Sequence, residues 1–208
     1  MAERAGGVRK RFPQIRWLSE RGLSRAADSV GRMLGHPVRL TLQEVQELPS
    51  STLSVLTGGA TLPMAGLQIR FHGDVAGWIF IVLPLPTVYR ILQALTGTPA
   101  EPRALTEMER SAVQEVGNIV ASSFASELGD LLGRRLIPSA PEFHLDNLPR
   151  LLRDMIASAR ALGPEVAVVQ GHFDEPARGI EGRVFIAIEA GAFASVAYGA
   201  AGERGVSI

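Results

Sequence analysis

The chain has 208 residues, a formal net charge of zero and no cysteine. This length allows one sizeable core, and the balanced charge argues against a general polyanion binder such as a nucleic-acid protein. The lack of cysteine excludes disulfides, thiolate chemistry and cysteine zinc sites. No apolar run is long enough to cross a membrane, and none follows the basic N-terminus as in a secretory signal. We therefore expect a cytoplasmic protein without a membrane or nucleic-acid partner.

The residue types that bind metals and nucleotides do not form any recognisable motif. Four histidines are present, and none lies three or four residues from another, the spacing that two metal ligands on one helix need. The chain also has no phosphate-binding loop, no dinucleotide fingerprint and no nucleophile elbow. The sequence therefore predicts no metal site.

Hydrophobic periodicity divides the first half into a helix, strands and a second, shorter helix. Residues 1–12 are rich in arginine and glycine without periodicity, which predicts a disordered basic tail. Apolar residues then recur at helical spacing over 13–34, alternate over 38–45, form a hairpin pattern over 66–83 and return to helical spacing over 84–95. Residues 48–59 fit either a strand or a helix. The glycine and prolines of 97–102 predict a linker.

The second half begins with the longest helical pattern in the chain, residues 104–133. Thr106 followed by Glu109 predicts a capping box at its start, and Gly133 is placed to end it. A partly extended stretch over 136–145, a helix over 148–162, a hairpin from 166–173 and 179–188, and a weak helix over 190–201 follow.

The two halves therefore show the same order of elements, which predicts an internal repeat. Residues 31–35 resemble 129–133, and residues 77–81 resemble 182–186. Two generic amphipathic units could agree by coincidence, but the preserved order favours duplication. We expect an α+β fold in which residues 13–208 form one pseudo-symmetric domain, with repeats 13–97 and 104–202. Its sheet should be mostly antiparallel, with the two long helices packed on it.

The helix predicted over 104–133 carries one polar stripe. At about 100° per residue, Ser111, Glu115, Asn118 and Ser122 fall in one narrow band, and apolar residues occupy the opposite side. Glu115 and Asn118 are neighbours on this surface, so a carboxylate lies beside a carboxamide that can hold a water molecule. Such a pair also occurs on many solvated helices, so by itself it is weak evidence for a functional site.

These residues resemble the signature of the CheC-type phosphatases of bacterial and archaeal chemotaxis, which are related to CheX and to the flagellar switch proteins FliY and FliM. The signature is Asp or Ser, three residues, Glu, two residues, Asn, twenty-two residues, Pro. Ser111, Glu115, Asn118 and Pro141 have this spacing. The surrounding residues of the helix and the duplicated architecture also resemble the family.

The resemblance implies that the chain dephosphorylates the phosphoaspartate of a CheY-type response regulator. Glu115 would then dock the receiver's active-site lysine, and Asn118 would orient the attacking water. The protein would need no cofactor of its own, since the receiver supplies Mg²⁺. A CheD-type deamidase is a further candidate partner. We expect a monomer, because the two repeats already fill the roles of two subunits.

The first helix lacks this signature. Aligning Gly35 with Gly133 places Trp17 at the position of Glu115 and Glu20 at that of Asn118. The same alignment matches Ser111 with Pro13 and Pro141 with Gln43. Decay of a dispensable first site is the simpler interpretation. Alternatively, the exposed aromatic side chain of Trp17 forms part of a protein-contact surface.

Two other functions remain open at this point. The chain could be a non-catalytic module that binds a receiver or a component of the flagellar switch, or a ligand-binding domain of the same fold. The intact Glu115 and Asn118 pair favours the phosphatase.

Overall fold

A computed structural model describes residues 2–49, 63–99 and 103–193; for residues 2–14, 47–49 and 193 only the backbone is described. The helices in these ranges are α1 (Ala2–Leu34), α2 (Leu85–Thr96), α3 (Glu107–Leu132), α4 (Leu148–Arg160) and the short 3-10 helix η2 (Ala190–Phe193). The strands are β1 (Arg39–Pro49), β2 (Pro63–Gly73), β3 (Gly77–Pro84), β4 (Leu136–Pro138), β5 (Glu142–Asn147), β6 (Glu165–Glu175) and β7 (Ile180–Glu189).

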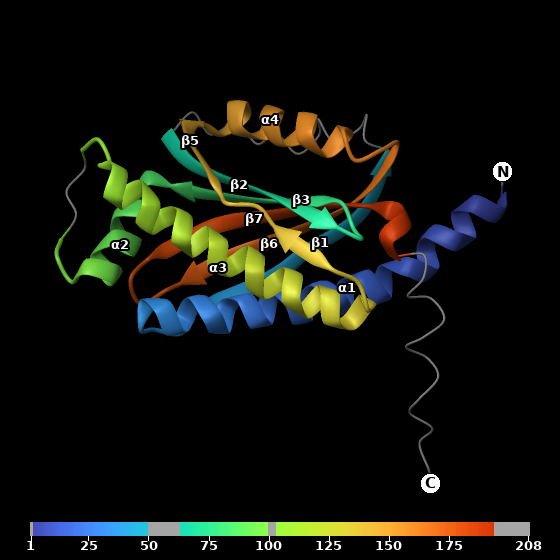
Figure 1. Cartoon of the computed structure of the whole chain (residues 1–208), viewed down its shortest axis with the longest axis horizontal. Coiled ribbons are helices and arrows are strands. Elements are labelled where there is room, and N and C mark those ends of the chain that lie inside the picture. The colour runs from blue at the N-terminus through green and yellow to red at the C-terminus, as the bar shows by residue number, and fades with distance from the viewer. Residues whose placement is uncertain (1, 50–62, 100–102, 194–208) are drawn as a thin grey trace, which may run out of the picture.

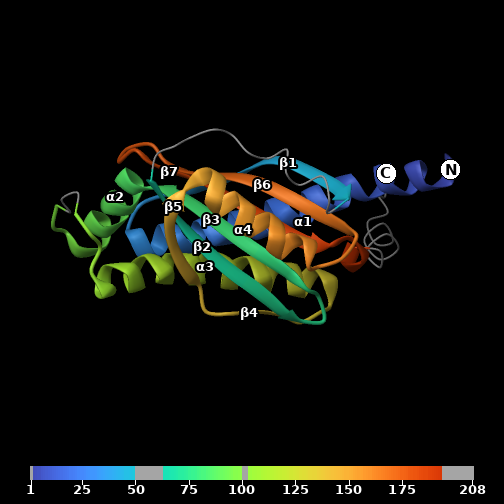
Figure 2. The same ribbon diagram turned by 90° about the horizontal axis from the view of Figure 1, so that it is seen from above.

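The strands form one seven-stranded sheet in the order β1-β6-β7-β3-β2-β4, with β5 also paired to β2. Every pairing is antiparallel, as predicted. The long helices α1 and α3 lie side by side on one face of the sheet, and α4 covers the other face (Figures 1 and 2). The α+β class and the placement of the two long helices are therefore confirmed.

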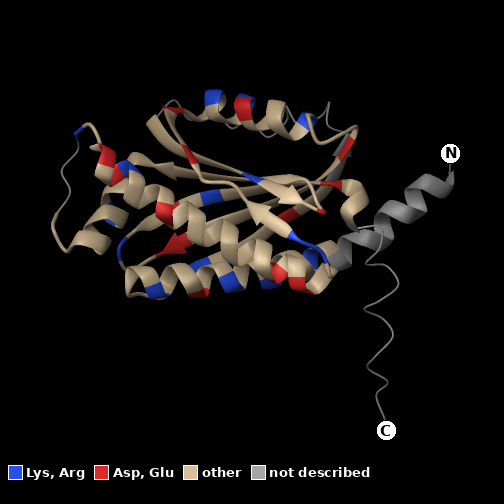
Figure 3. Ribbon diagram, viewed as in Figure 1, with Lys and Arg blue, Asp and Glu red and all other residues tan. Residues whose placement is uncertain are grey.

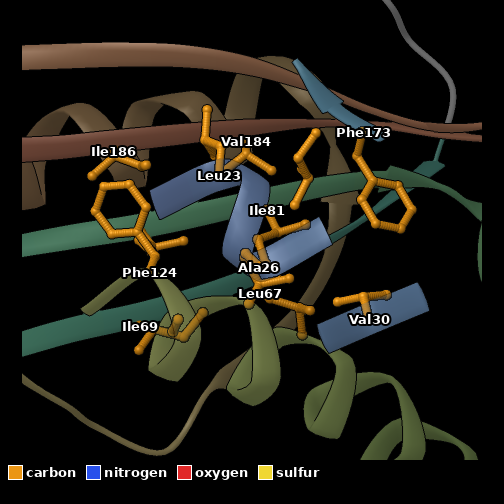
Figure 4. Packing of buried hydrophobic residues seen from close by; sticks show 14 of the residues in the cluster. Leu23, Ala26, Val30, Leu67, Ile69, Ile81, Phe124, Phe173, Val184 and Ile186 are labelled. Atoms are coloured by element: carbon orange, nitrogen blue, oxygen red, sulfur yellow. The ribbon is translucent and has the colours of Figure 1, made fainter. Parts of the chain in front are cut away.

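The main core fills the space between the sheet and the layer of α1, α2 and α3. It includes residues from both long helices and from β1, β2, β3, β4, β6 and β7, some of which are drawn in Figure 4. A smaller core lies between the sheet and α4, and Phe80 and Phe185 belong to it. Strand β3 therefore alternates between two buried faces, with Ile79 and Ile81 toward the long helices and Phe80 toward α4. This explains why its sequence is a nearly continuous apolar run.

The register of the sheet repeats between the two halves. Phe80 and Phe185, which the sequence alignment matches to each other, are direct partners at the centre of the sheet. A pseudo-twofold axis that relates β3 to β7 would pass between them. The outer strands on the two sides of this centre pair across the two halves. Strand β1 of the first half pairs with β6 of the second half, and β4 and β5 of the second half pair with β2 of the first half.

The pairing of the outer strands is also similar in the two halves. Leu40 pairs with Phe173 in one half, as Pro138 pairs with Phe71 in the other. The register of β1 shifts between Leu42 and Glu44, and the matching stretch of the second half is interrupted between β4 and β5. Proline has no backbone N–H to donate, so the prolines there favour a full break over a bulge. The arrangement is what a duplication would produce; descent from one ancestral unit stays a prediction.

Both long helices end in the same way. Gly35 and Gly133 have φ angles of 71° and 62°, in the left-handed region that favours glycine. The amide of His36 donates to the carbonyl of Gly31 at 3.1 Å, and the amide of Arg134 donates to the carbonyl of Gly129 at 3.0 Å. The glycines that support the sequence alignment therefore serve the same purpose, to reverse the chain after each helix.

The two ends of the chain differ from their predictions. Helix α1 begins at Ala2, so residues 2–12 are helical, whereas the sequence predicted a disordered basic tail. The residues there include alanine, glutamate, lysine and arginine, which favour helix even where no apolar face recurs. At the other end, the predicted helix over 190–201 is a 3-10 turn over Ala190–Phe193, and its remainder lies outside the described residues.

Charged residues of both signs lie along the helices, and others lie on the strands of the sheet (Figure 3). In the described ranges, none of the helices is long and apolar enough to cross a lipid bilayer. Residues 50–59 and 100–102, where the sequence predicted an ambiguous element and part of a linker, fall outside the described ranges.

Candidate functional site

The candidate site lies on α3, whose first turn is firmly held. Thr106 accepts a hydrogen bond from the Glu109 amide at 3.2 Å, and the Glu109 carboxylate accepts one from the Thr106 amide at 2.8 Å. The predicted capping box is thus confirmed. Arg103 also binds the Glu109 carboxylate, at 2.7 and 2.9 Å. The hydrogen bond from Arg103, followed by that from the Thr106 backbone, lowers the pKa of Glu109 to about 2.

The opposite side of α3 is buried against the sheet. Val113, Val116, Val120 and Phe124 are each at most 2% exposed, as the predicted apolar side requires. Gly117, between Glu115 and Asn118 in the sequence, faces Leu67 of β2. A Cβ at Gly117 would lie 2.8 Å from Leu67 Cδ1. This glycine therefore allows the helix to approach the strand.

The two long helices are connected by Glu127, a carboxylate of α3 that is only 8% exposed. Arg21 and Arg25 of α1 both bind it, each at 2.8 Å. The hydrogen bond from Arg25, then that from Arg21, lowers the pKa of Glu127 against the opposing effect of burial. The carboxylate therefore stays ionised and holds α3 in a defined place relative to α1.

The polar stripe is exposed to solvent along the outer surface of α3. Glu115, Ser111 and Ser122 are exposed, and Asn118 is half-buried. Asn118 Nδ2 lies 3.3 Å from Glu115 Oε2, and Ser122 Oγ lies 3.5 Å from Asn118 Oδ1. The carboxylate and the carboxamide are therefore adjacent, on a helix whose first turn and buried side are fixed. Contacts this long on an exposed surface are weak and easily exchanged for a partner's groups.

Pro141 lies on the connection between β4 and β5, which runs beside α3. The side chain of Gln114 links the two: its Nε2 donates to the Pro141 carbonyl oxygen at 2.7 Å. The sequence predicted a role for Pro141 but none for Gln114. Because the two residues are far apart in the sequence, local periodicity could not reveal their contact.

Met108 is a second residue of this surface that was not predicted from the sequence. It is 82% exposed, although it is a large apolar side chain. It precedes Ser111 by three residues and Glu115 by seven, so it lies on the same side of α3. An exposed apolar side chain at the end of a polar stripe is suited to contact with another protein.

The matching surface of α1 has different chemistry. Trp17, at the position of Glu115, is 46% exposed, and the guanidinium carbon of Arg21 lies 5.4 Å from its ring centroid. Glu20, at the position of Asn118, pairs with Arg16 at 3.2 Å. Neither residue provides a carboxamide beside a free carboxylate. The first helix therefore lacks the arrangement that Glu115 and Asn118 form.

The region around the polar stripe, and most of the chain, are similar to known proteins. The CheC-like family profile matches residues 108–145, which contain the stripe and Pro141. The chain is also 27% identical over 158 residues to the CheY-P phosphatase CheC of Bacillus subtilis, a match that covers 74% of this chain and 76% of the relative. The predicted resemblance to the CheC-type family is confirmed.

Solved structures of other proteins share the fold. FliY of Thermotoga maritima has a TM-score of 0.66 and 21% identity, with 88% of this chain and 91% of FliY covered. CheX in a CheX–CheY–BeF3–Mg2+ complex from Borrelia burgdorferi has a TM-score of 0.56 and 18% identity, with 82% of this chain and 96% of that chain covered. At these identities the likeness shows a common fold.

Proposed function

We propose that the protein accelerates dephosphorylation of the phosphoaspartate of a CheY-type response regulator. The observation that carries the proposal is the adjacent pair of Glu115 and Asn118 on the outer surface of a fixed helix, 3.3 Å apart. The names of relatives support it: one is a CheY-P phosphatase, and another is found in complex with CheY.

The reaction requires little from the protein beyond position. A water oxygen attacks phosphorus in line with the bond to the aspartyl oxygen; that bond breaks, the electron pair stays on the carboxylate, and inorganic phosphate leaves, with the protons of the water passing to the phosphate and to solvent. An acyl phosphate is already activated, and the receiver would contribute Mg²⁺ to neutralise the phosphoryl oxygens. The partner protein then has to align the water, and alignment can contribute a large share of the rate.

Asn118 is the residue suited to this alignment. Its carboxamide has one oxygen that accepts and one nitrogen that donates, so it can bind a water and direct a lone pair toward phosphorus. In the free protein the nitrogen donates to Glu115 and the oxygen accepts from Ser122. Both contacts are long, so docking can replace them at small cost.

Glu115 is suited to docking. It is an exposed carboxylate on the same surface, and a lysine in the active site of the receiver would pair with it. Pairing with that lysine would withdraw the carboxylate from Asn118 and release the amide nitrogen for the water. The site must admit a folded partner, and the exposed stripe on α3 is open to one.

The alternative is a non-catalytic module that binds a receiver or a component of the flagellar switch. The shared fold with FliY is compatible with it, and the altered residues Trp17 and Glu20 show that one of the two matching surfaces lacks the motif. The intact pair on α3 favours the phosphatase over this alternative.

The two functions differ in one measurement. The protein is mixed with phosphorylated CheY-type receivers, and release of inorganic phosphate is followed against the receiver alone. The phosphatase predicts faster release that saturates with receiver concentration and requires Glu115. Binding of a phosphorylated receiver without faster release would support the non-catalytic module and contradict the proposal.

A further inference from the structure

The connection between β4 and β5 is held at both ends. On the sheet side, the Ser139 amide donates to the Arg70 carbonyl at 2.8 Å, and the Ser139 hydroxyl accepts from the Arg70 amide at 3.0 Å. On the helix side, Gln114 Nε2 donates to the Pro141 carbonyl at 2.7 Å. The segment 139–141 is therefore suspended between β2 and α3, and Gln114 provides the hydrogen bond from the helix.

Gln114 lies at the edge of the candidate site. It precedes Asn118 by four residues, so the two side chains lie about 40° apart around the helix axis and one turn apart along it. Glu115 lies on the other side of Asn118, toward Met108. The segment 139–141, which Gln114 holds, therefore borders the stripe next to Asn118 and on the side away from Glu115. The half-buried state of Gln114 is consistent with its place between the stripe and this segment.

We infer that Gln114 is a positioning residue, which holds the segment 139–141 as a border that fixes how a phosphorylated receiver lies over Asn118. This inference rests on the proposed function. Proline at 141 suits the role because its fixed φ and lack of an N–H leave the carbonyl as the hydrogen-bonding group of that residue. Gln114 binds that carbonyl.

The inference predicts a selective effect on turnover. Affinity for the receiver depends on the whole docked surface, whereas alignment of the water depends on small displacements near Asn118; a 1 Å misplacement can reduce a rate by roughly 100-fold. Gln114→Glu has nearly the same shape but presents an acceptor to the Pro141 carbonyl. We expect it to reduce the maximal rate of phosphate release about tenfold. The dissociation constant for a beryllofluoride-loaded receiver should change less than about threefold.

Gln114→Lys is the matched variant, since its amine can still donate to the carbonyl. It should restore most of the rate. Hydrogen exchange of the amides of Ala140, Glu142 and Phe143 provides a readout without a receiver: exchange should be faster in Gln114→Glu than in the original protein and in Gln114→Lys. The urea midpoint of each variant shows whether an effect comes from general destabilisation.

Each outcome decides the inference. A lower rate with nearly unchanged affinity, faster exchange in residues 140–143 and rescue by lysine would support it. An unchanged rate in Gln114→Glu, or rate and affinity that fall together with the urea midpoint, would overturn it. If neither the original protein nor any variant accelerates phosphate release, the proposed function fails instead, and the exchange experiment still reports whether Gln114 holds the segment.

Discussion

Gly117 provides a quantitative test of how α3 is seated on the sheet. In the interior of a helix, alanine is more stable than glycine by roughly 0.5–1 kcal/mol. Here the added Cβ would lie 2.8 Å from Leu67 Cδ1, and Leu67 is only 1% exposed, so it has little room to move. Overpacking of this kind costs roughly 1–3 kcal/mol. We therefore expect Gly117→Ala to lower the free energy of unfolding by about 1 kcal/mol.

The decisive comparison repeats this substitution where Leu67 is alanine. Leu67→Ala alone should cost about 2–5 kcal/mol, because it leaves a cavity. In that background the Cβ of residue 67 remains, 3.6 Å from the Cβ at position 117, which is an ordinary van der Waals distance, so Gly117→Ala should stabilise by up to about 1 kcal/mol. The coupling between the two sites is then about 2 kcal/mol. Urea unfolding of the four proteins, followed by circular dichroism, measures it.

Ser126→Ala, on an exposed position of the same helix, is the matched control and should have equal effects in both backgrounds. If Gly117→Ala changed stability equally in both backgrounds, the close approach of α3 to β2 would be refuted. That result would also remove the reason given for a glycine between Glu115 and Asn118.

Two further predictions concern charge and the first helix. Because Trp17 lies outside the site on α3, the rate of phosphate release from a receiver should differ by less than about twofold between Trp17→Ala and the original protein. A large loss of rate would mean that the first helix takes part in the reaction. Because the pKa of Glu109 is lowered to about 2 from 4.5, its ionised form stabilises the fold above pH 4.5, and this contribution disappears as the pH falls to about 2. The stability difference between the original protein and Glu109→Gln should therefore be largest above pH 4.5 and decrease toward pH 2. For Glu107→Gln on the same turn, this stability difference should change less with pH. Acid denaturation of the three proteins measures both differences.

The elements with strong periodicity could be predicted from the sequence. The helix that contains Val113, Val116, Val120 and Phe124 buries this face, and Thr106 caps it as expected. The two hairpins and the antiparallel sheet also agree with the prediction. These features succeed because alternation and helical spacing record which side of an element is buried.

The parts that could not be predicted depend on contacts between distant segments or on weak local patterns. The bond from Gln114 to the Pro141 carbonyl is of the first kind, as are the bonds from Arg21 and Arg25 to Glu127. The helical start of α1 is of the second kind, because residues 2–12 have helix-forming composition without an apolar stripe. Hydrophobic periodicity indicates which residues are buried, so it does not predict a helix that has no recurring apolar face.

For the candidate site, the sequence placed Ser111, Glu115 and Asn118 on one surface, and the structure brings Glu115 and Asn118 within 3.3 Å. The sequence could not show that Met108 extends this surface as an exposed apolar side chain. A methionine in a helix is usually part of the core, so its exposure needs the packed structure to be seen. The catalytic and docking roles of Glu115 and Asn118 stay predictions.

The central claim is that Asn118 orients the water that attacks the phosphoaspartate. The most direct test is the rate of phosphate release at saturating receiver, compared between the original protein, Asn118→Ala and the matched variant Glu20→Ala at the equivalent position of α1. We expect Asn118→Ala to lose about 100-fold in this rate, with its fold and receiver binding retained, and Glu20→Ala to change the rate little. An Asn118→Ala protein that releases phosphate as fast as the original would contradict it.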